Sequence, residues 1–493
     1  MTRKKEGARL LISLGLTAIV IAAILFLLKQ VTLKPIVTTQ EPIIPPSNPS
    51  PILMSLGGEI VVKVRTSPDK ENGIAAFAKG DFATAVEKFT ASLKNSPNDP
   101  ETLIYLNNAK IAQDTSAALK VAVIAPISFD PNQAEEILRG VAQAQDEVNS
   151  SGGINGKKLQ IMIASSIRSS GNNSSTNSEQ LDNELIKDNS LLAVVGSRRN
   201  SSIYNDKGLV LVFPIEPARD TGNQENSSQA VNNQSNPAES NYIFYVNSSD
   251  VLVDTHSRHI VREARNIAIC GDSSRGNNST NSSNATVSFN KILVDKYTNA
   301  INKYGGQVIS FPCDLGDKNF QPSAFVNEAI ETQKANGFLF IPTNRNIFYA
   351  TKVAQEIRGR KPFFASEIMY KQTTLDNGKD FQGMVLPVYW HRDANKNNPF
   401  ADKALKLWNA QVNHRTAGAY DALQVIIAGL KQDNTRQGLK NVLSNANFSA
   451  SGATGTIKFS PSGERQGKAF LVKVESCDAS KPCASGYEFV LLQ

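Results

Sequence analysis

Residues 119–165 read LKVAVIAPISFDPNQAEEILRGVAQAQDEVNSSGGINGKKLQIMIAS. The stretch opens and closes on short apolar runs, at 119–127 and 159–165, of the kind that form buried strands. Between these runs, apolar residues recur at the spacing of one helix face: Ile137, Val141, Ala144 and Val148. The pattern predicts a strand, a helix and a second strand, which is the repeating unit of a parallel sheet.

The same alternation continues along the chain. A helical pattern at 178–187 is followed by the apolar run 191–196. The pattern then starts again, with further apolar runs that each precede a helical stretch: 266–272, 307–312, 337–342 and 362–366. Two successive series of this kind predict an α/β protein with two Rossmann-like lobes.

The residues Pro126, Gly140, Glu147, Asn149 and 152–156 (GGING) suggest a family. In this order they resemble the opening of type I periplasmic binding proteins of the branched-chain amino-acid class. The glycines also make physical sense, because a tight turn after a helix needs residues that tolerate positive φ.

Later motifs extend the resemblance to the C-terminus. Residues 193–196 and 201–214 are similar to the third strand, helix and fourth strand of the family. Residues 418–430 (GAYDALQVIIAGL) are similar to a late helix, and residues 453–475 to the final hairpin, which turns through Gly463.

The resemblance implies a type I periplasmic binding fold at 118–493, with two lobes joined by a three-strand hinge. Lobe 1 would comprise about 118–247 and 393–465, and lobe 2 about 248–392 and 466–493. A small polar ligand, an amino acid or a small carboxylate, would bind in the cleft, where strands of open sheets end. Closure on the ligand would present the loaded protein to an ABC-type permease, with no cofactor.

In lobe 1 the resemblance implies that Ser201 or Ser202 binds a ligand carboxylate at the start of a helix. Arg198 or Arg199 could clamp such a group with two hydrogen bonds, or both could be solvated. Glu216 stands where the family has small and hydroxyl residues, which is a departure from the usual branched-chain pocket.

In lobe 2, Glu367 follows an apolar run where the family carries the acid that binds the ligand ammonium. It could instead be an ordinary carboxylate that caps a helix. Asn344 lies where an aromatic residue often lines the family's cleft, and Asp272 opens the loop that usually contains a tyrosine. Tyr389 could form a wall of the cleft or pack in the hinge.

The N-terminus predicts a membrane anchor at 1–29. Four basic residues precede the apolar run 10–28: Arg3, Lys4, Lys5 and Arg9. As a helix this run would span roughly 28 Å, the thickness of a bilayer core. Basic residues stay on the cytoplasmic side, so the bulk of the chain would lie in the periplasm or extracytoplasmic space, beside the inner or plasma membrane. The alternative is a cleaved signal peptide.

Two segments connect the predicted anchor to the lobes. The proline-rich stretch 30–70 predicts an extended linker. Residues 71–117 form a helical segment, and within it 72–112 resemble one tetratricopeptide repeat and the first helix of a second. Such repeats usually need about three copies for stability, so this segment would pack on its neighbour or on a protein partner. A plain helical hairpin that acts as a spacer is the alternative.

The four cysteines have no CxxC spacing and no histidines clustered near them, which disfavours a zinc site. In an exported protein Cys477 and Cys483 could staple a hairpin, and Cys270 could pair with Cys313 at the ends of two strands. The alternative is four free thiols.

Other function classes find little support. The net charge is +7, but the basic residues form no stripe with aromatic residues, which disfavours nucleic-acid binding. The sequence contains no GxSxG elbow, no P-loop and no HExxH motif, so we expect no enzyme activity. The competing hypothesis is a membrane-tethered sensor or scaffold that uses the helical repeat for protein interaction and delivers no solute.

Overall fold

The computed structural model describes residues 52–114, 117–128, 130–166, 174–196, 202–214, 242–271, 289–310, 312–317, 319–343, 346–478, 480 and 483–492. The predicted anchor at 10–28 lies outside these residues. Within the described part, no helix combines the length and apolar character needed to cross a membrane.

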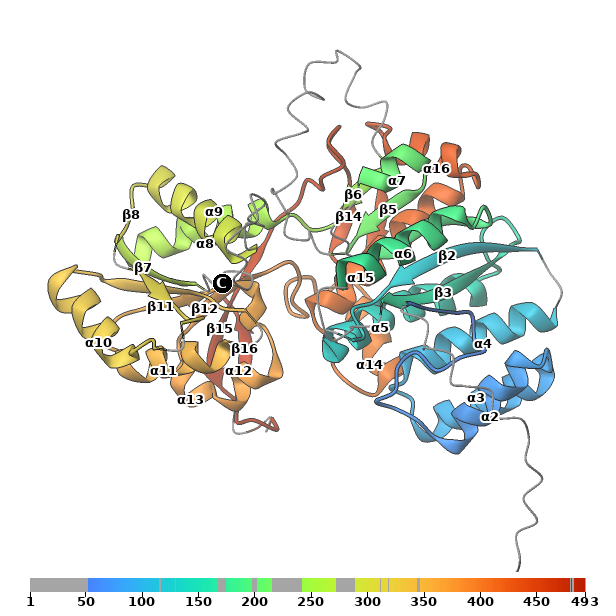
Figure 1. Ribbon diagram of the computed structural model, residues 1–493, viewed down its shortest axis with the longest axis horizontal. Coiled ribbons are helices and arrows are strands. Elements are labelled where there is room, and N and C mark those ends of the chain that lie inside the picture. Colours follow the sequence, from blue (N-terminus) through green and yellow to red (C-terminus); the bar gives the residue numbers. More distant parts are fainter. Residues whose placement is uncertain are drawn as a thin grey trace, which may run out of the picture. The chain divides into compact units, whose positions relative to one another are not determined.

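The first sheet has six strands in the order β1-β3-β2-β4-β5-β6. They are β1 (Ile52–Ser55), β2 (Ala118–Ile124), β3 (Lys158–Ser166), β4 (Leu191–Gly196), β5 (Val210–Phe213) and β6 (Ile243–Tyr245). All neighbours are parallel except β1, which pairs antiparallel with β3. The sheet and its helices form lobe 1 (Figure 1). The predicted unit at 119–165 is therefore correct, with both of its strands at neighbouring places in the sheet.

Lobe 1 draws helices from distant parts of the chain: α5 (Pro131–Ser150), α6 (Ser174–Lys187), α7 (Ser202–Lys207), α14 (Phe400–Trp408), α15 (His414–Leu430) and α16 (Arg436–Leu443). The short hairpin β13 (Ala450–Gly452) and β14 (Gly455–Ile457) packs beside α15. Gly140 explains how closely α5 and α15 approach, because a Cβ atom at Gly140 would collide with the carbonyl oxygen of Thr416. Only glycine fits at this crossing.

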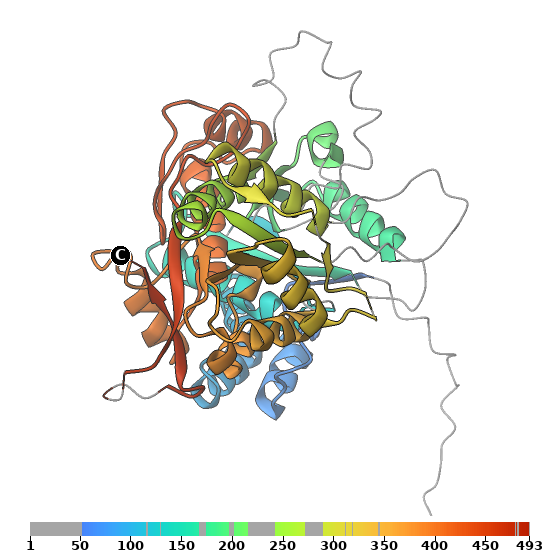
Figure 2. The ribbon, with the colours of Figure 1, turned by 90° about the vertical axis from the view of Figure 1, so that its left-hand side faces the viewer.

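The second sheet forms lobe 2 and has the order β16-β15-β12-β11-β10-β7-β8, with β9 also paired to β7. Its strands are β7 (Asn266–Gly271), β8 (Gln307–Val308), β9 (Cys313–Asp314), β10 (Gly337–Ile341), β11 (Phe363–Ala365), β12 (Val385–Val388), β15 (Phe470–Ser476) and β16 (Tyr487–Leu491). The strands from β12 to β8 are parallel, and β15 and β16 add an antiparallel hairpin at one edge, drawn in red in Figure 2.

The helices of lobe 2 are α8 (Ser249–Glu263), α9 (Phe289–Lys303), α10 (Pro322–Asn327), α11 (Ile347–Ile357), α12 (Gln372–Asp376) and α13 (Gly378–Phe381). Helix α8 packs on β12 and β15, and α13 packs on β15 and β16. The chain passes between the two sheets three times, after β6, after β12 and after β14. We call these passages the first, second and third crossover.

The predicted extended linker at 30–70 is wrong in its last part. Residues Ile52–Ser55 form β1, and α2 already begins at Pro68. The apolar residues of β1 pair with β3, whose outer edge would otherwise present unpaired backbone groups. This pairing could not be inferred from a short apolar run that follows a proline-rich stretch.

The helical segment comprises α2 (Pro68–Ala78), α3 (Phe82–Asn95) and α4 (Pro100–Gln113). Helix α4 packs on α5 and β3, and its residues are buried almost throughout. Ile74 and Phe89, from α2 and α3, belong to the same apolar core as α5 and α15. The segment therefore packs on its neighbour and is part of lobe 1.

Both cysteine pairs form disulfides, Cys270 with Cys313 and Cys477 with Cys483. The first joins β7 to β9, and the second spans the turn between β15 and β16. Replacing Cys477 and Cys483 together by serine should lower the free energy of unfolding by roughly 2 kcal/mol, because the open loop gains conformational entropy when unfolded. Urea unfolding with and without reductant checks this, and an unchanged midpoint in the double variant would contradict it.

Candidate functional site

The structure describes two of the predicted site residues in full, Glu367 and Tyr389. Ser202 opens α7, but its side chain is not described. The remaining predicted residues lie outside the described part of the chain and stay predictions: Arg198, Arg199, Ser201, Glu216, Asp272 and Asn344.

Glu367 begins a short 3₁₀ helix directly after β11, at the carboxyl end of a parallel strand. Its side chain is partly buried, and burial raises the pKa of the carboxyl above its ordinary value, while the nearby Arg415 partly offsets this effect. Among the described residues, no other residue donates a hydrogen bond to this carboxylate. A partly buried carboxylate without such a donor can pair with a cationic group of a ligand.

Residues of α15, in lobe 1, face the same segment of lobe 2. The guanidinium of Arg415 donates a hydrogen bond to the carbonyl oxygen of Tyr370 (3.1 Å). The ring of His414 stacks on the Tyr370 ring, with centroids 4.9 Å apart, and Tyr370 stacks on Phe489 of β16 (4.3 Å). His414 also meets the Tyr389 ring edge to face (6.2 Å). The first turn of α15 therefore joins the two lobes.

His414 is buried, and neither ring nitrogen has a hydrogen-bond partner in the described structure. Burial lowers its pKa well below the ordinary value, and the charge of Arg415 adds to this effect. The imidazole is consequently neutral at physiological pH and acts here as an aromatic ring.

Charges of both signs surround Arg415. Burial lowers its pKa, whereas three carboxylates oppose that effect: Glu367, Asp130 and Glu136. Burial and Arg415 together lower the pKa of Lys371 to about 8, and Asp130 acts in the other direction. Asp130 also caps α5 by accepting a hydrogen bond from the backbone of Gln133 (3.1 Å). Acidic and basic groups from both lobes thus lie together, an arrangement suited to a zwitterionic or polar solute.

Tyr389 also lines a pocket of about 240 Å³ that all three crossovers border. We call it the hinge pocket. Its lining residues are Val246, Asn247, Ser248, Val251, Tyr389, Thr454, Thr456, Arg465, Gly467, Lys468 and Phe470. Tyr389 thus contacts both the hinge and the ring of His414.

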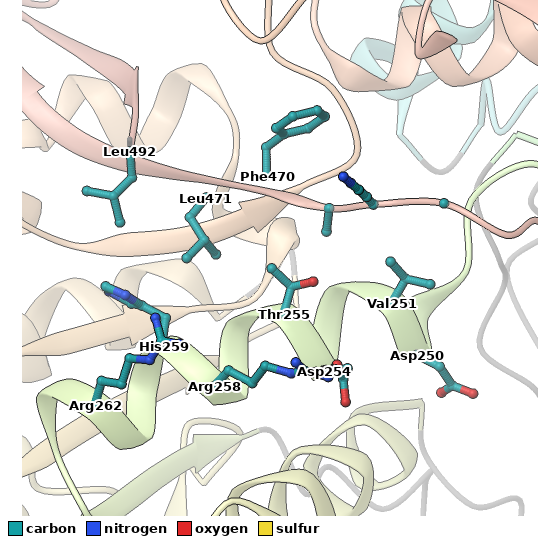
Figure 3. A pocket seen from close by; sticks show the side chains of 13 residues that line it. Asp250, Val251, Asp254, Thr255, Arg258, His259, Arg262, Phe470, Leu471 and Leu492 are labelled. Atoms are coloured by element: carbon teal, nitrogen blue, oxygen red, sulfur yellow. Dashed lines mark hydrogen bonds and ion pairs between the residues drawn. The ribbon is translucent and has the colours of Figure 1, made fainter. Parts of the chain in front are cut away.

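A larger open groove of about 860 Å³ runs along α8, beside the start of β15 (Figure 3). Val251 and Thr255 of α8 face Phe470 and Leu471 across it. One of its acids, Asp254, is paired with Arg258 (2.9 Å). The groove lies on lobe 2 alone and contains none of the predicted ligand-binding residues.

The sequence did not reveal Arg415, His414, Tyr370 or Lys371 as site residues. Tyr370 and Lys371 follow Glu367 closely in the sequence, and this closeness could have identified them as candidate site residues. Arg415 and His414 gave no such signal, because they precede the 418–430 motif and meet Tyr370 only through the tertiary fold. In the described part of the chain, no cluster of histidine, cysteine and acidic residues could hold a metal ion.

Comparison with solved structures supports the fold. A leucine-binding protein from Thermotoga maritima is 14% identical, with a TM-score of 0.57, and the match covers 76% of this chain and 97% of that one. An ABC transporter substrate-binding protein from Sphaerobacter thermophilus is also 14% identical, with a TM-score of 0.58, and the match covers 76% of this chain and 97% of that one. A solute-binding protein from R. palustris in complex with benzoate is 13% identical, with a TM-score of 0.55, and the match covers 76% of this chain and 96% of that one.

A search of curated proteins found no match. The family model described as "Periplasmic binding protein" matches residues 118–479. It begins after the helical segment, so the likeness of residues 72–112 to a tetratricopeptide repeat stays a prediction. The match spans most of the sequence and agrees with the two-lobed fold, and the chain therefore belongs to the periplasmic binding protein family.

Proposed function

We propose that this protein is a membrane-anchored, extracytoplasmic solute-binding protein of an ABC-type transporter. It binds a small polar solute, an amino acid or a related small carboxylate, between its two lobes. The observation that carries the proposal is Glu367, a partly buried carboxylate at the carboxyl end of β11 with no hydrogen bond from another described residue. The raised pKa of Glu367 reflects the lost hydration that a ligand ammonium would replace.

The neighbouring residues support a ligand with both an amine and an anionic group. Arg415 donates a hydrogen bond to the Tyr370 carbonyl oxygen, and its charge acts on Glu367 from the other lobe. A solute that contacts both lobes would add to the contacts that hold them together. The solved relatives include proteins named for leucine and for benzoate, both of which carry a carboxylate.

The scaffold alternative is less well supported, because the apolar residues of α2 and α3 pack inside lobe 1. A helical repeat used for docking would present such a face to a partner. The proposed membrane anchor at 10–28 and the extracytoplasmic location rest on the sequence pattern of the N-terminus.

A thermal-shift screen of the purified protein against amino acids and small carboxylates tests the proposal. A solute that binds the folded state raises the melting temperature, by an amount that grows with the solute concentration. We expect an amine-bearing carboxylate to do so, and an absence of any stabilising solute in both classes would contradict the proposal.

Replacing Glu367 by glutamine should weaken the affinity for that solute by roughly ten-fold or more, because a hydrogen bond to a charged group is worth about 1.5–3 kcal/mol. Glu331→Gln, at an exposed acid elsewhere on lobe 2, is the control and should leave the affinity unchanged. Calorimetric titration of the three proteins measures the effect. Equal affinity in wild type and Glu367→Gln would remove Glu367 from the site.

A further inference from the structure

We propose that the hinge pocket is a second binding site, which takes a small oxyanion such as phosphate or sulfate. The pocket has a volume of about 240 Å³, below the size of most sites for drug-sized ligands but ample for an ion of this class. Neither Glu367 nor Arg415 lines this pocket, and the proposed anion binding goes beyond the proposed solute binding.

The charges that line the pocket favour an anion. Among the described residues that line it, the charged ones are Arg465 and Lys468, and both are cationic. Lys468 is exposed, and it forms no hydrogen bond or ion pair in the described part of the chain. Its ammonium is therefore free to bind an anion.

Arg465 provides a second, buried donor. Its side chain is only 8% exposed, and its two terminal nitrogens are used inside the protein: one binds Thr454 Oγ1 and pairs with Asp421 (3.4 Å), and the other binds the Thr456 carbonyl (3.0 Å). The Nε atom has no hydrogen-bond partner among the residues that the structure describes. A buried N–H of a charged group costs free energy when it has no acceptor. An anion in the hinge pocket can supply that acceptor to Nε.

The unused Nε lies close to Gly467. A methyl group at Gly467 would lie 3.5 Å from Arg465 Nε, and the atoms nearest to that methyl group would all belong to Arg465. Gly467 lines the hinge pocket, and so does Arg465. The absence of a side chain at Gly467 leaves room beside Nε.

Helix α8 adds the positive end of its dipole. The residue before the helix, Ser248, lines the pocket, and its side chain makes no capping hydrogen bond to the first turn. An oxyanion near this end of the 15-residue helix would interact favourably with the helix dipole.

The hinge pocket lies where the chain passes between the lobes, so an anion bound there would contact the segments that connect them. Residues of the first, second and third crossover all line it, among them Ser248, Tyr389 and Lys468. An anion bound there would hold the three connecting segments together. The pocket shares Val251, Gly467, Lys468 and Phe470 with the groove along α8 in Figure 3, which offers a path from solvent.

Calorimetric titration of the full-length protein with inorganic phosphate, at ionic strength held constant with sodium chloride, tests the proposal. We expect saturable binding of one phosphate per chain. Lys468→Gln should weaken it at least five-fold by removing a donor, and Gly467→Val should do so by filling the space beside Arg465 Nε. Both positions are exposed, so neither change disturbs the core.

Lys379→Gln is the matched control, because it removes the same charge from an exposed position on α13. Its phosphate affinity should equal that of the wild type. The proposal is overturned if phosphate gives no saturable heat, or if both pocket variants bind it as the wild type does. It is also overturned if Lys379→Gln weakens binding as much as Lys468→Gln.

Discussion

Replacing Lys70 by alanine is expected to lower the free energy of unfolding by about 3–5 kcal/mol, since it removes one partner of a buried ion pair. The Lys70 side chain is 0% exposed. Its ammonium contacts Asp99 Oδ2 (2.9 Å) and Glu101 Oε2 (2.7 Å), and it donates a hydrogen bond to the carbonyl of Arg65 (2.9 Å). Without Lys70, two buried carboxylates would lose the ammonium that contacts them both.

These carboxylates also hold the backbone around them. Glu101 Oε1 accepts hydrogen bonds from the backbone of Val61 (2.7 Å) and Val62 (3.1 Å), and Asp99 caps α4. Burial raises the pKa of Glu101, and Lys70 is the main group that opposes this effect. The loss of Lys70 should therefore loosen the segment that joins β1 to the helices.

Urea unfolding compares Lys70→Ala with the control Lys88→Ala. Lys88 lies on α3 and pairs with Glu87 at the surface, where such pairs contribute little. We expect a shifted midpoint for Lys70→Ala alone. Equal midpoints for both variants would contradict a stabilising role for the buried ion pair of Lys70.

Replacing Asp421 by alanine is the second change with a large expected effect, about 3 kcal/mol, near the lower end for broken buried pairs. Asp421 lies on α15, and its side chain is 0% exposed. It accepts hydrogen bonds from the backbone of Ala453 (2.5 Å) and Thr454 (3.3 Å), and it pairs with Arg465 (3.4 Å). Arg465 would keep its bonds to carbonyl oxygens, which limits the loss.

Asp206→Ala, at an exposed acid on α7, is the control and should unfold as the wild type does. The same measurement has a pH dependence. Burial raises the pKa of Asp421 to about 6, from about 3.8, so the folded protein binds more protons than the unfolded chain between these values. The contribution of Asp421 to stability thus falls as the pH rises from about 4 to about 6, and Asp421→Asn should abolish that part of the pH profile.

Much of the fold was predictable because most of the parallel strands are buried along most of their length. Runs such as residues 191–196 and 337–341 are almost wholly apolar, which sets β4 and β10 apart from the surface helices around them. The two α/β series of the chain follow from that pattern, whereas the packing of residues 52–114 on lobe 1 does not. Strand β1 could not be predicted, because it forms by pairing with the edge of β3, a contact that the local sequence does not indicate.

The candidate site was less predictable. Glu367 stood out because it follows β11 in the sequence, where a polar side chain at the end of a strand is easy to notice. Arg415 reaches the same place from a helix of the other lobe, through a contact between residues 45 positions apart. Local patterns carry no information on such contacts. Arg198, Arg199 and Ser201 lie outside the described part of the chain, and the roles predicted for them and for Ser202 stay predictions.

A crystal structure of the protein with the solute that stabilises it most would test the central claim most directly. The account predicts that the solute lies between the lobes, with its amine within hydrogen-bond distance of Glu367 and with contacts to residues of lobe 1. A solute bound only along α8, or held by one lobe without Glu367, would contradict it.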